Sequence, residues 1–266
     1  LIVYGVITSA SIGDLFIAGI VPGLLMSFLM MGTVFLISQV RGYAGGNAFH
    51  VRALAVSIWN GKYSLMMPVI VLGGIYTGMV TPVEAAVVAV LYALVVAMLV
   101  KRTLTFRGLW DCFTESSTVC GGLTIIMGTA VFFGEYMTMN MIPQSLAAFI
   151  IEFVSSKYTL LIIICIFLLI IGTFMETLAT TMILTPILLP VITTFDIDVI
   201  QFGVIMVVTN AIGMLTPPLG LNLFVACNLT GLSLEQVSSE VIPFICALIL
   251  GLALIAFIPW LSLVLL

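Results

Sequence analysis

Residues 209–224, TNAIGMLTPPLGLNLF, place an asparagine, glycines, a threonine and two adjacent prolines inside a long apolar run from 200 to 228. A proline in a helix interior costs about 3 kcal/mol, because it removes an N–H group and clashes with the preceding turn. Irregular backbone at bilayer depth is tolerated only where protein buries it or water lines it. The run therefore predicts a discontinuous membrane helix over 200–228, broken between Asn210 and Gly220. The alternative is a single span with a proline kink.

The composition of the chain is that of a multi-pass membrane protein. Of its 266 residues, 63% are hydrophobic and 7% are charged, whereas soluble domains carry about 25% charged residues. The net charge of −4 is small and dispersed, so we expect the lipid bilayer, and no nucleic acid, as a partner. The five cysteines lie mostly in apolar segments without metal-ligand spacing, and we interpret them as packing residues.

The basic residues indicate how the spans are oriented, because loops rich in Lys and Arg stay in the cytoplasm. Six of the seven Lys and Arg lie in two loops: Arg41, Arg52 and Lys62, then Lys101, Arg102 and Arg107. Between them, the apolar runs 65–80 and 83–100 are expected to cross outward and return. We expect residues 41–64 to form a cytoplasmic interfacial connector and residues 65–139 to hold scaffold helices.

Two short apolar limbs follow the scaffold region. Residues 140–157 are amphipathic and predict a helix along the outer interface. The limbs 158–174 and 182–195 are each shorter than the roughly 20 residues of a simple span, and METLATT separates them. This pattern favours a re-entrant hairpin over 158–195, and two ordinary spans remain the alternative.

Thr-Pro occurs three times, as Thr81-Pro82, Thr185-Pro186 and Thr216-Pro217. Threonine at the N-cap with proline at the first helical position is a common helix start. All three dipeptides are therefore predicted to begin helices. Glu84 stands three residues after Thr81, which predicts a capping box and gives Glu84 a structural role.

Two distant stretches share an order of features. LIVYGVITSASIGDLFIAGIVPGLL begins at Leu1, and LNLFVACNLTGLSLEQVSSEVIPFIC begins at Leu221. Each starts with an apolar half-helix, passes a small polar loop with a serine and an acid, and enters a new span at a proline, Pro22 or Pro243. In the topology above these spans run inward and outward, respectively. Inverted repeats of broken helices are typical of secondary transporters.

The repeat predicts how the chain is organised. Residues 1–40 are the end of a first inverted repeat, and residues 241–266 are the final transmembrane helix of the second. An equivalent hairpin and broken helix are expected upstream of the first residue. We therefore interpret the sequence as the second half of a transporter plus the tail of its first half.

The break in 200–228 has the chemistry of an ion site. Carbonyls at the end of one half-helix and amides at the start of the next supply partial charges, and sodium prefers oxygen ligands. The candidate ion-binding residues here are Asn210, Gly213, Thr216, Pro217 and Gly220.

The tip of the hairpin offers the complementary surface, with Gly172, Thr173, Glu176 and Thr177 as candidate ion-binding residues. An acid within an apolar stretch is a functional candidate, but Glu176 could equally cap the second limb. Four neighbouring residues are expected to face a substrate: Thr180, Thr181, Pro218 and Asn222.

Three blocks together resemble one transporter family. They are GGIYTGMVTPVEAAVVAVLYAL, GTFMETLATTMILTPILLPV and FGVIMVVTNAIGMLTPPLGLNLFVA. They are similar to the large membrane (M) subunit of tripartite ATP-independent periplasmic (TRAP) transporters. By motif, the family's second hairpin corresponds to Gly172–Pro190 and its second break to Asn210–Gly220. The family's first hairpin and first break have no counterpart here.

The resemblance implies an all-α membrane protein with the elevator fold of the ion transporter superfamily, in the bacterial inner membrane. It implies sodium as the coupling ion, with no other cofactor. It also implies a small membrane (Q) subunit and a periplasmic substrate-binding (P) protein as partners.

The expected function is sodium-coupled import of a small organic anion, such as a dicarboxylate or sialic acid. Two alternatives stay open: a passive channel, and a sodium-coupled organic anion transporter without a binding protein. An enzyme is not expected, because the only histidine, His50, lies in a basic loop and no apolar segment pairs a nucleophile with a base.

Overall fold

The computed structural model covers residues 1–266 and describes all of them except 44–49, 143–144, 146–153, 155 and 218–219. The described residues form helices and no strands, and six helices are long and apolar enough to cross a membrane. The prediction of an all-α membrane protein is confirmed. The chain divides into two compact units, one of residues 1–41 with 126–266 and one of residues 42–125.

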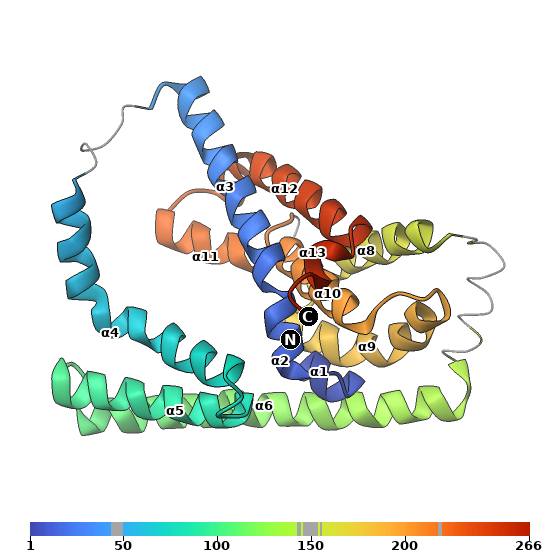
Figure 1. Ribbon diagram of the computed structural model, residues 1–266, viewed down its shortest axis with the longest axis horizontal. Helices are drawn as coiled ribbons and strands as arrows, with labels where there is room; N and C mark the ends of the chain where they lie inside the picture. The colour runs from blue at the N-terminus through green and yellow to red at the C-terminus, as the bar shows by residue number, and fades with distance from the viewer. Residues whose placement is uncertain (44–49, 143–144, 146–153, 155, 218–219) are drawn as a thin grey trace. The chain divides into compact units, whose positions relative to one another are not determined.

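The first unit holds nine helices among its described residues, and they are labelled in Figure 1. They are α1 (Ile2–Thr8), α2 (Ile12–Ala18), α3 (Ile20–Arg41), α8 (Lys157–Phe174), α9 (Thr177–Thr194), α10 (Val199–Gly213), α11 (Leu221–Thr230), α12 (Leu234–Phe257) and α13 (Trp260–Leu263). A further helix, α6 (Phe106–Met139), crosses the boundary between the units.

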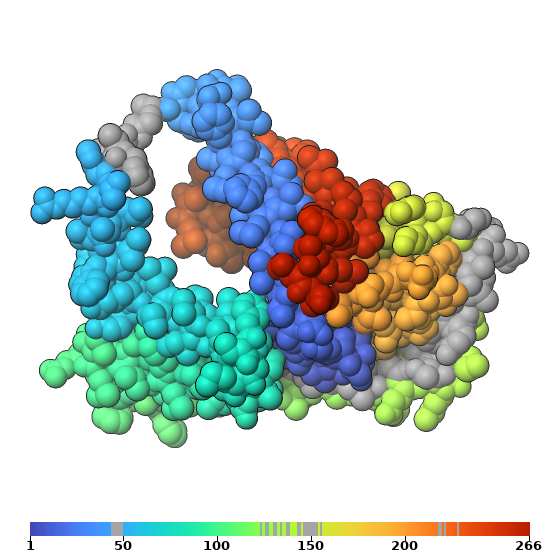
Figure 2. All heavy atoms as spheres, in the orientation of Figure 1, coloured from blue at the N-terminus to red at the C-terminus, as the bar shows by residue number. Residues whose placement is uncertain are grey.

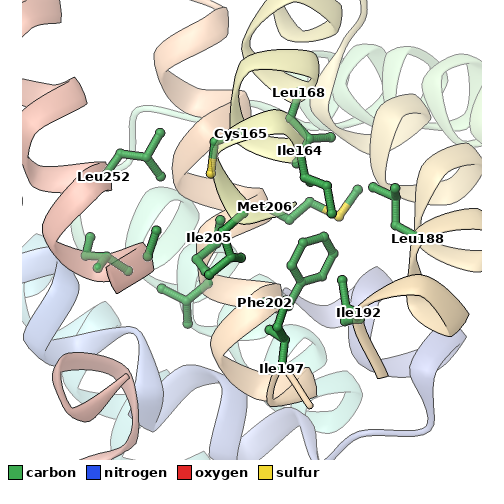
Figure 3. Close-up of a cluster of buried hydrophobic side chains, with 14 of the residues drawn as sticks. Ile164, Cys165, Leu168, Leu188, Ile192, Ile197, Phe202, Ile205, Met206 and Leu252 are labelled. Atoms are coloured by element: carbon green, nitrogen blue, oxygen red, sulfur yellow. The ribbon is translucent and has the colours of Figure 1, made fainter. Parts of the chain in front are cut away.

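Helix α10 lies at the centre of the first unit. It packs along α8 and also contacts α9, α12 and α2. The side chains of Phe202, Ile205 and Met206 are fully buried. In the core cluster of Figure 3, Phe202 lies among side chains from α8 and α9. A helix that is apolar on all sides belongs in the interior, and this burial fixes α10 firmly within the unit.

The start of α10 is tied to two other elements. Asp198 caps it, with its Oδ1 accepting from the backbone N–H groups of Ile200 and Gln201. The amide of Gln201, which is only 3% exposed, donates to carbonyls near the end of α12, those of Ile255 and Ala256. The Tyr4 hydroxyl of α1 donates to the carbonyl of Val199 at 2.7 Å. The bonds of Asp198 and Gln201 satisfy helix-end groups that have no partner within their own helix, and the bond from Tyr4 ties α1 to the start of α10.

Helices α3 and α12 lie side by side and run antiparallel (Figure 2). Arg41, at the end of α3, forms an ion pair of 2.7 Å with Glu240 in the first part of α12. Further along α12, Gly251 lies against Met26 in the first part of α3. If the two sequence copies are inverted relative to each other, their corresponding spans must run in opposite directions, and α3 and α12 do so.

The two copies also share their local hydrogen bonding. Helices α1 and α11 each end in a threonine, Thr8 or Thr230, whose hydroxyl donates to the carbonyl four residues earlier. A left-handed residue follows each, and then a serine that caps the next helix, Ser11 of α2 or Ser233 of α12. The likeness seen in the sequence therefore has a structural basis in matched caps.

The second unit contains α4 (Val51–Tyr76), α5 (Pro82–Val95) and a π-helical turn, η1 (Val96–Val100). Helices α4 and α5 pack together, and the Tyr92 hydroxyl donates to the carbonyl of Tyr63 at 2.8 Å. The predicted capping box of α5 is confirmed, because the backbone N–H of Thr81 donates to Glu84 at 2.7 Å and the backbone N–H of Glu84 donates back to the Thr81 hydroxyl.

The other two Thr-Pro predictions are wrong. Pro186 lies inside α9, and Pro217 precedes α11, which begins only at Leu221. The hydroxyl of Thr185 contacts a neighbouring helix instead of capping its own. Burial of the apolar face of α9 outweighs the hydrogen bond that Pro186 removes, and this tertiary effect overrides the local signal.

Some expected boundaries also move. Helix α4 runs unbroken through the expected junction between the connector 41–64 and the following span. Helix α12 begins at Leu234, earlier than the expected 241, because Ser233 and Gln236 form a capping box there. Pro243 is therefore inside the helix. The expected interfacial helix 140–157 falls mostly outside the described residues.

Candidate ion site at the hairpin tip and the helix break

The ends of α8 and α10 cross with their backbones in direct contact. A Cβ atom added to Gly213 would lie 2.7 Å from the Cα of Gly172 and 2.8 Å from its carbonyl carbon. Only glycine allows such an approach. The thiol of Cys165 lies near the hydroxyl of Thr209 further back on the same two helices. The helices thus run parallel and end together.

The helix break follows this crossing, between the end of α10 at Gly213 and the start of α11 at Leu221. Asn210 and Gly213, which the sequence placed in the break, belong to the last turn of α10. The Thr216 hydroxyl donates to the carbonyl of Ile212 at 2.8 Å, and its backbone N–H donates to Gly213 at 2.9 Å.

Several carbonyls expected to be free in the break already accept one hydrogen bond. Met214 accepts from the backbone N–H of Asn222 at 3.2 Å, and Thr216 accepts from that of Gly220 at 3.3 Å. A carbonyl oxygen has two lone pairs. Each of these oxygens therefore keeps one lone pair that a cation could use.

Asn210 is the unusual side chain of this region. It is 0% exposed, and neither its amide nitrogen nor its amide oxygen has a hydrogen-bond partner among the described residues. An unsatisfied buried polar group costs about 1–3 kcal/mol, and native proteins contain few of them. Its neighbours include Gly172, whose added Cβ would lie 3.5 Å from the Asn210 carbonyl oxygen. The backbone of Asn210 therefore lies at the crossing of α8 and α10.

The predicted hairpin tip corresponds to the turn between α8 and α9. Both helices are long and apolar enough to cross a membrane, so the re-entrant hairpin stays a prediction. Glu176 is exposed and caps α9, with its Oε2 accepting from the N–H of Leu178 at 3.1 Å. The sequence left two roles open for Glu176, ion binding and helix capping, and the structure shows the capping role. Thr173 is buried and its hydroxyl donates to the carbonyl of Ile170. Thr177 reaches across to the break, where its hydroxyl donates to the sulfur of Met214 at 3.1 Å.

The expected substrate-facing residues are dispersed. Thr180 and Thr181 are buried in α9, and their hydroxyls donate to the carbonyls of Glu176 and Thr177. Asn222 is exposed at the start of α11. Pro218 lies outside the described residues. The hydroxyl protons of the two threonines are engaged within α9, and neither side chain is exposed.

Sequence reasoning overlooked Met214. The residue directly follows α10 and contacts the hairpin through its sulfur. Its position inside the TNAIGMLTPP stretch was the available signal, but an apolar side chain there gave no reason to single it out.

Comparison with protein families decides which group the chain belongs to. A family model described as the tripartite ATP-independent periplasmic transporter, DctM component, matches residues 1–261. The chain belongs to the DctM family. The resemblance drawn from the three sequence blocks is confirmed. As a member of a permease family with six apolar helices among the described residues, this DctM chain is a multi-pass inner-membrane protein and not an enzyme.

Three relatives illustrate the range of this DctM family. The chain is 41% identical, over 97% of its length, to the isethionate TRAP transporter permease protein DctMQ of Oleidesulfovibrio alaskensis, and it covers 41% of that protein. It is 37% identical to the C4-dicarboxylate TRAP transporter large permease DctM of Pseudomonas aeruginosa, with 100% of the chain matched to 62% of that protein. It is 36% identical to the sialic acid TRAP transporter large permease SiaM of Vibrio cholerae, again over 100% of the chain and 62% of that protein.

The chain thus spans between 41% and 62% of the length of these three relatives. The features described above, the α8–α9 hairpin and the α10–α11 break, lie within the matched region.

Proposed function

We propose that this chain forms the second inverted repeat, and the tail of the first, of the large subunit of a TRAP transporter, which imports an organic anion with sodium by an elevator movement. The proposal rests on family membership for transport and on one structural observation for sodium. That observation is the buried side chain of Asn210, which has no partner in the part of the chain that the structure describes and belongs to the last turn of α10, just before the helix break.

A bound cation would provide a partner for the oxygen of this amide. Hard cations take side-chain and backbone carbonyl oxygens as ligands, and the Oδ1 of Asn210 is such an oxygen. The break adds carbonyls with a spare lone pair, and α10 points the negative end of its dipole at the same place. In this proposal Gly172, Thr173, Thr177, Gly213, Thr216 and Gly220 line the ion site with Asn210.

The substrate class follows from the relatives. Those compared above are named for isethionate, C4-dicarboxylates and sialic acid, all of which carry an acidic group. We therefore infer an organic anion as the substrate.

The partners are inferred in the same way. One relative is named DctMQ, which supports a Q-type small membrane subunit beside this chain. The family description as tripartite and periplasmic supports a periplasmic binding protein as the third component.

Uptake by the complete transporter in proteoliposomes tests the proposal. An inward sodium gradient is expected to accumulate a labelled organic anion, such as a C4-dicarboxylate or sialic acid, above its external concentration. An equal potassium gradient should not do so. Downhill flux that is the same with either cation, and independent of a binding protein, would instead favour a passive channel.

A further inference from the structure

Helices α9 and α10 touch through two hydrogen bonds of an unusual kind. In each, a threonine hydroxyl of α9 donates to a methionine sulfur on or just after α10. Thr177 donates to Met214 at 3.1 Å, and Thr185 donates to Met206 at 3.5 Å. The pairs lie eight residues apart on both segments, so they fix an antiparallel register between the two helices.

This register places Thr181 opposite Asn210, midway between the two pairs. The Thr181 hydroxyl donates to the carbonyl of Thr177 and not to Asn210, whose amide has no partner. A row of three threonines on α9 thus faces a row of methionine, asparagine and methionine, with the unpaired amide in the middle.

The two hydroxyl–sulfur pairs occupy different environments. Thr185 and Met206 are 1% and 0% exposed and belong to the interior of the unit. Thr177 is the first residue of α9, Met214 is the first residue after α10, and both are only half-buried. The same chemistry therefore occurs once in the core and once where the hairpin tip meets the helix break.

Two consecutive residues at the end of α10 hold the hairpin tip, each through a different limb. Gly213 contacts the α8 limb through Gly172, and Met214 contacts the α9 limb through Thr177. The turn of the hairpin, Met175 and Glu176, lies between these two points. Loss of either contact would free one limb of the tip from the break.

We propose that the Thr177–Met214 contact is a positioning contact, which seats the hairpin tip on the helix break and so holds the ligand oxygens around Asn210. The inference rests on the proposed sodium-coupled function. A thioether is a weak acceptor, so this contact tunes the ion site without being a ligand of the ion.

The test measures sodium affinity in the complete transporter through its thermal unfolding midpoint. Sodium chloride is titrated while potassium chloride keeps the ionic strength constant, and the affinity follows from the rise in midpoint. Thr177→Val removes the hydroxyl and Met214→Leu removes the sulfur, and both substitutions keep the approximate side-chain volume. Each is expected to raise the sodium dissociation constant about twofold to twelvefold, the range that loss of a neutral hydrogen bond gives.

Three controls separate positioning from general packing. The double variant should match the single variants, because both remove the same contact. Thr177→Ser, which keeps the hydroxyl, should restore the affinity. Thr185→Val and Met206→Leu break the matched pair in the core, and they should lower the midpoint equally at every sodium concentration without changing the affinity.

The other outcomes each overturn a different statement. If Thr177→Val weakens sodium binding and Met214→Leu does not, Thr177 acts as a direct ligand and the positioning role is wrong. If the core pair changes the affinity as much as the tip pair, the effect is packing alone. A wild-type protein whose midpoint does not respond to sodium refutes the proposed function itself, and the inference with it.

Discussion

Substitution of Gly213 by alanine tests whether the crossing of α8 and α10 sets the geometry of the candidate ion site. The new Cβ would lie 2.7 Å from the Cα of Gly172. Carbon atoms rest at about 3.5–4.0 Å, so the two backbones must part by roughly 0.8 Å or more. Overpacking of this kind costs about 1–3 kcal/mol, and the greater helix propensity of alanine offsets about 0.5–1 kcal/mol of that cost.

The same displacement should also weaken ion binding. Ligand distances in metal sites hold to within about 0.2 Å, and a shift of roughly 0.8 Å exceeds that tolerance several-fold. We expect Gly213→Ala to weaken sodium binding at least about tenfold, which corresponds to about 1.4 kcal/mol. The assay is the sodium titration of the unfolding midpoint in the complete transporter, with potassium as the replacement cation.

Gly23→Ala is the matched control, because no atom lies within 4 Å of a Cβ added at this position of α3. It should stabilise the helix slightly and leave the sodium affinity unchanged. If Gly213→Ala binds sodium as tightly as Gly23→Ala does, the crossing does not shape the ion site, and the reasoning from backbone contact is wrong.

Three further predictions concern the frame around the site and the energetics of transport. Gln201→Leu should lower the free energy of unfolding by about 1–3 kcal/mol, because carbonyls at the end of α12 lose their donor; an unchanged unfolding midpoint would show that this cap is dispensable. Thr81→Ala should lower the free energy of unfolding by about 1 kcal/mol, because α5 loses its capping box. Thr103→Ala is the comparison, because the hydroxyl of this nearby threonine makes only a 3.5 Å contact. The reversal potential of transport should fit two sodium ions per monoanion. Two ions that move down a tenfold gradient and a potential of about 100 mV supply roughly 7 kcal/mol for uptake. A reversal potential that fits one ion would contradict this stoichiometry.

Local signals in the sequence located the helix ends well where the cap is made by neighbouring residues. Thr81 and Glu84 meet within one turn, and their capping box needs no other part of the chain. The break after α10 was predicted for the same reason, because adjacent prolines and glycines act on their own backbone. The helix start predicted at Thr185-Pro186 was wrong, because the packing of α9 against α10 decides the backbone conformation there.

The contacts that assemble the candidate site could not be read from the sequence. Gly172 and Gly213 touch only because two apolar helices pack in parallel, and no local pattern specifies their register. The bond from Tyr4 to Val199 joins residues 195 positions apart. The sequence named Asn210 for its polarity, but the absence of any partner for its amide is a property of the folded unit.

The central claim is that sodium binds at Asn210, and the substitution Asn210→Leu tests it most directly. Leucine removes a buried amide that is unpaired among the described residues, so the variant should unfold at a higher temperature than wild type in potassium alone. Addition of sodium should then stabilise the wild-type transporter and leave the variant unchanged. A variant that gains as much stability from sodium as wild type does would place the ion elsewhere and contradict the proposed site.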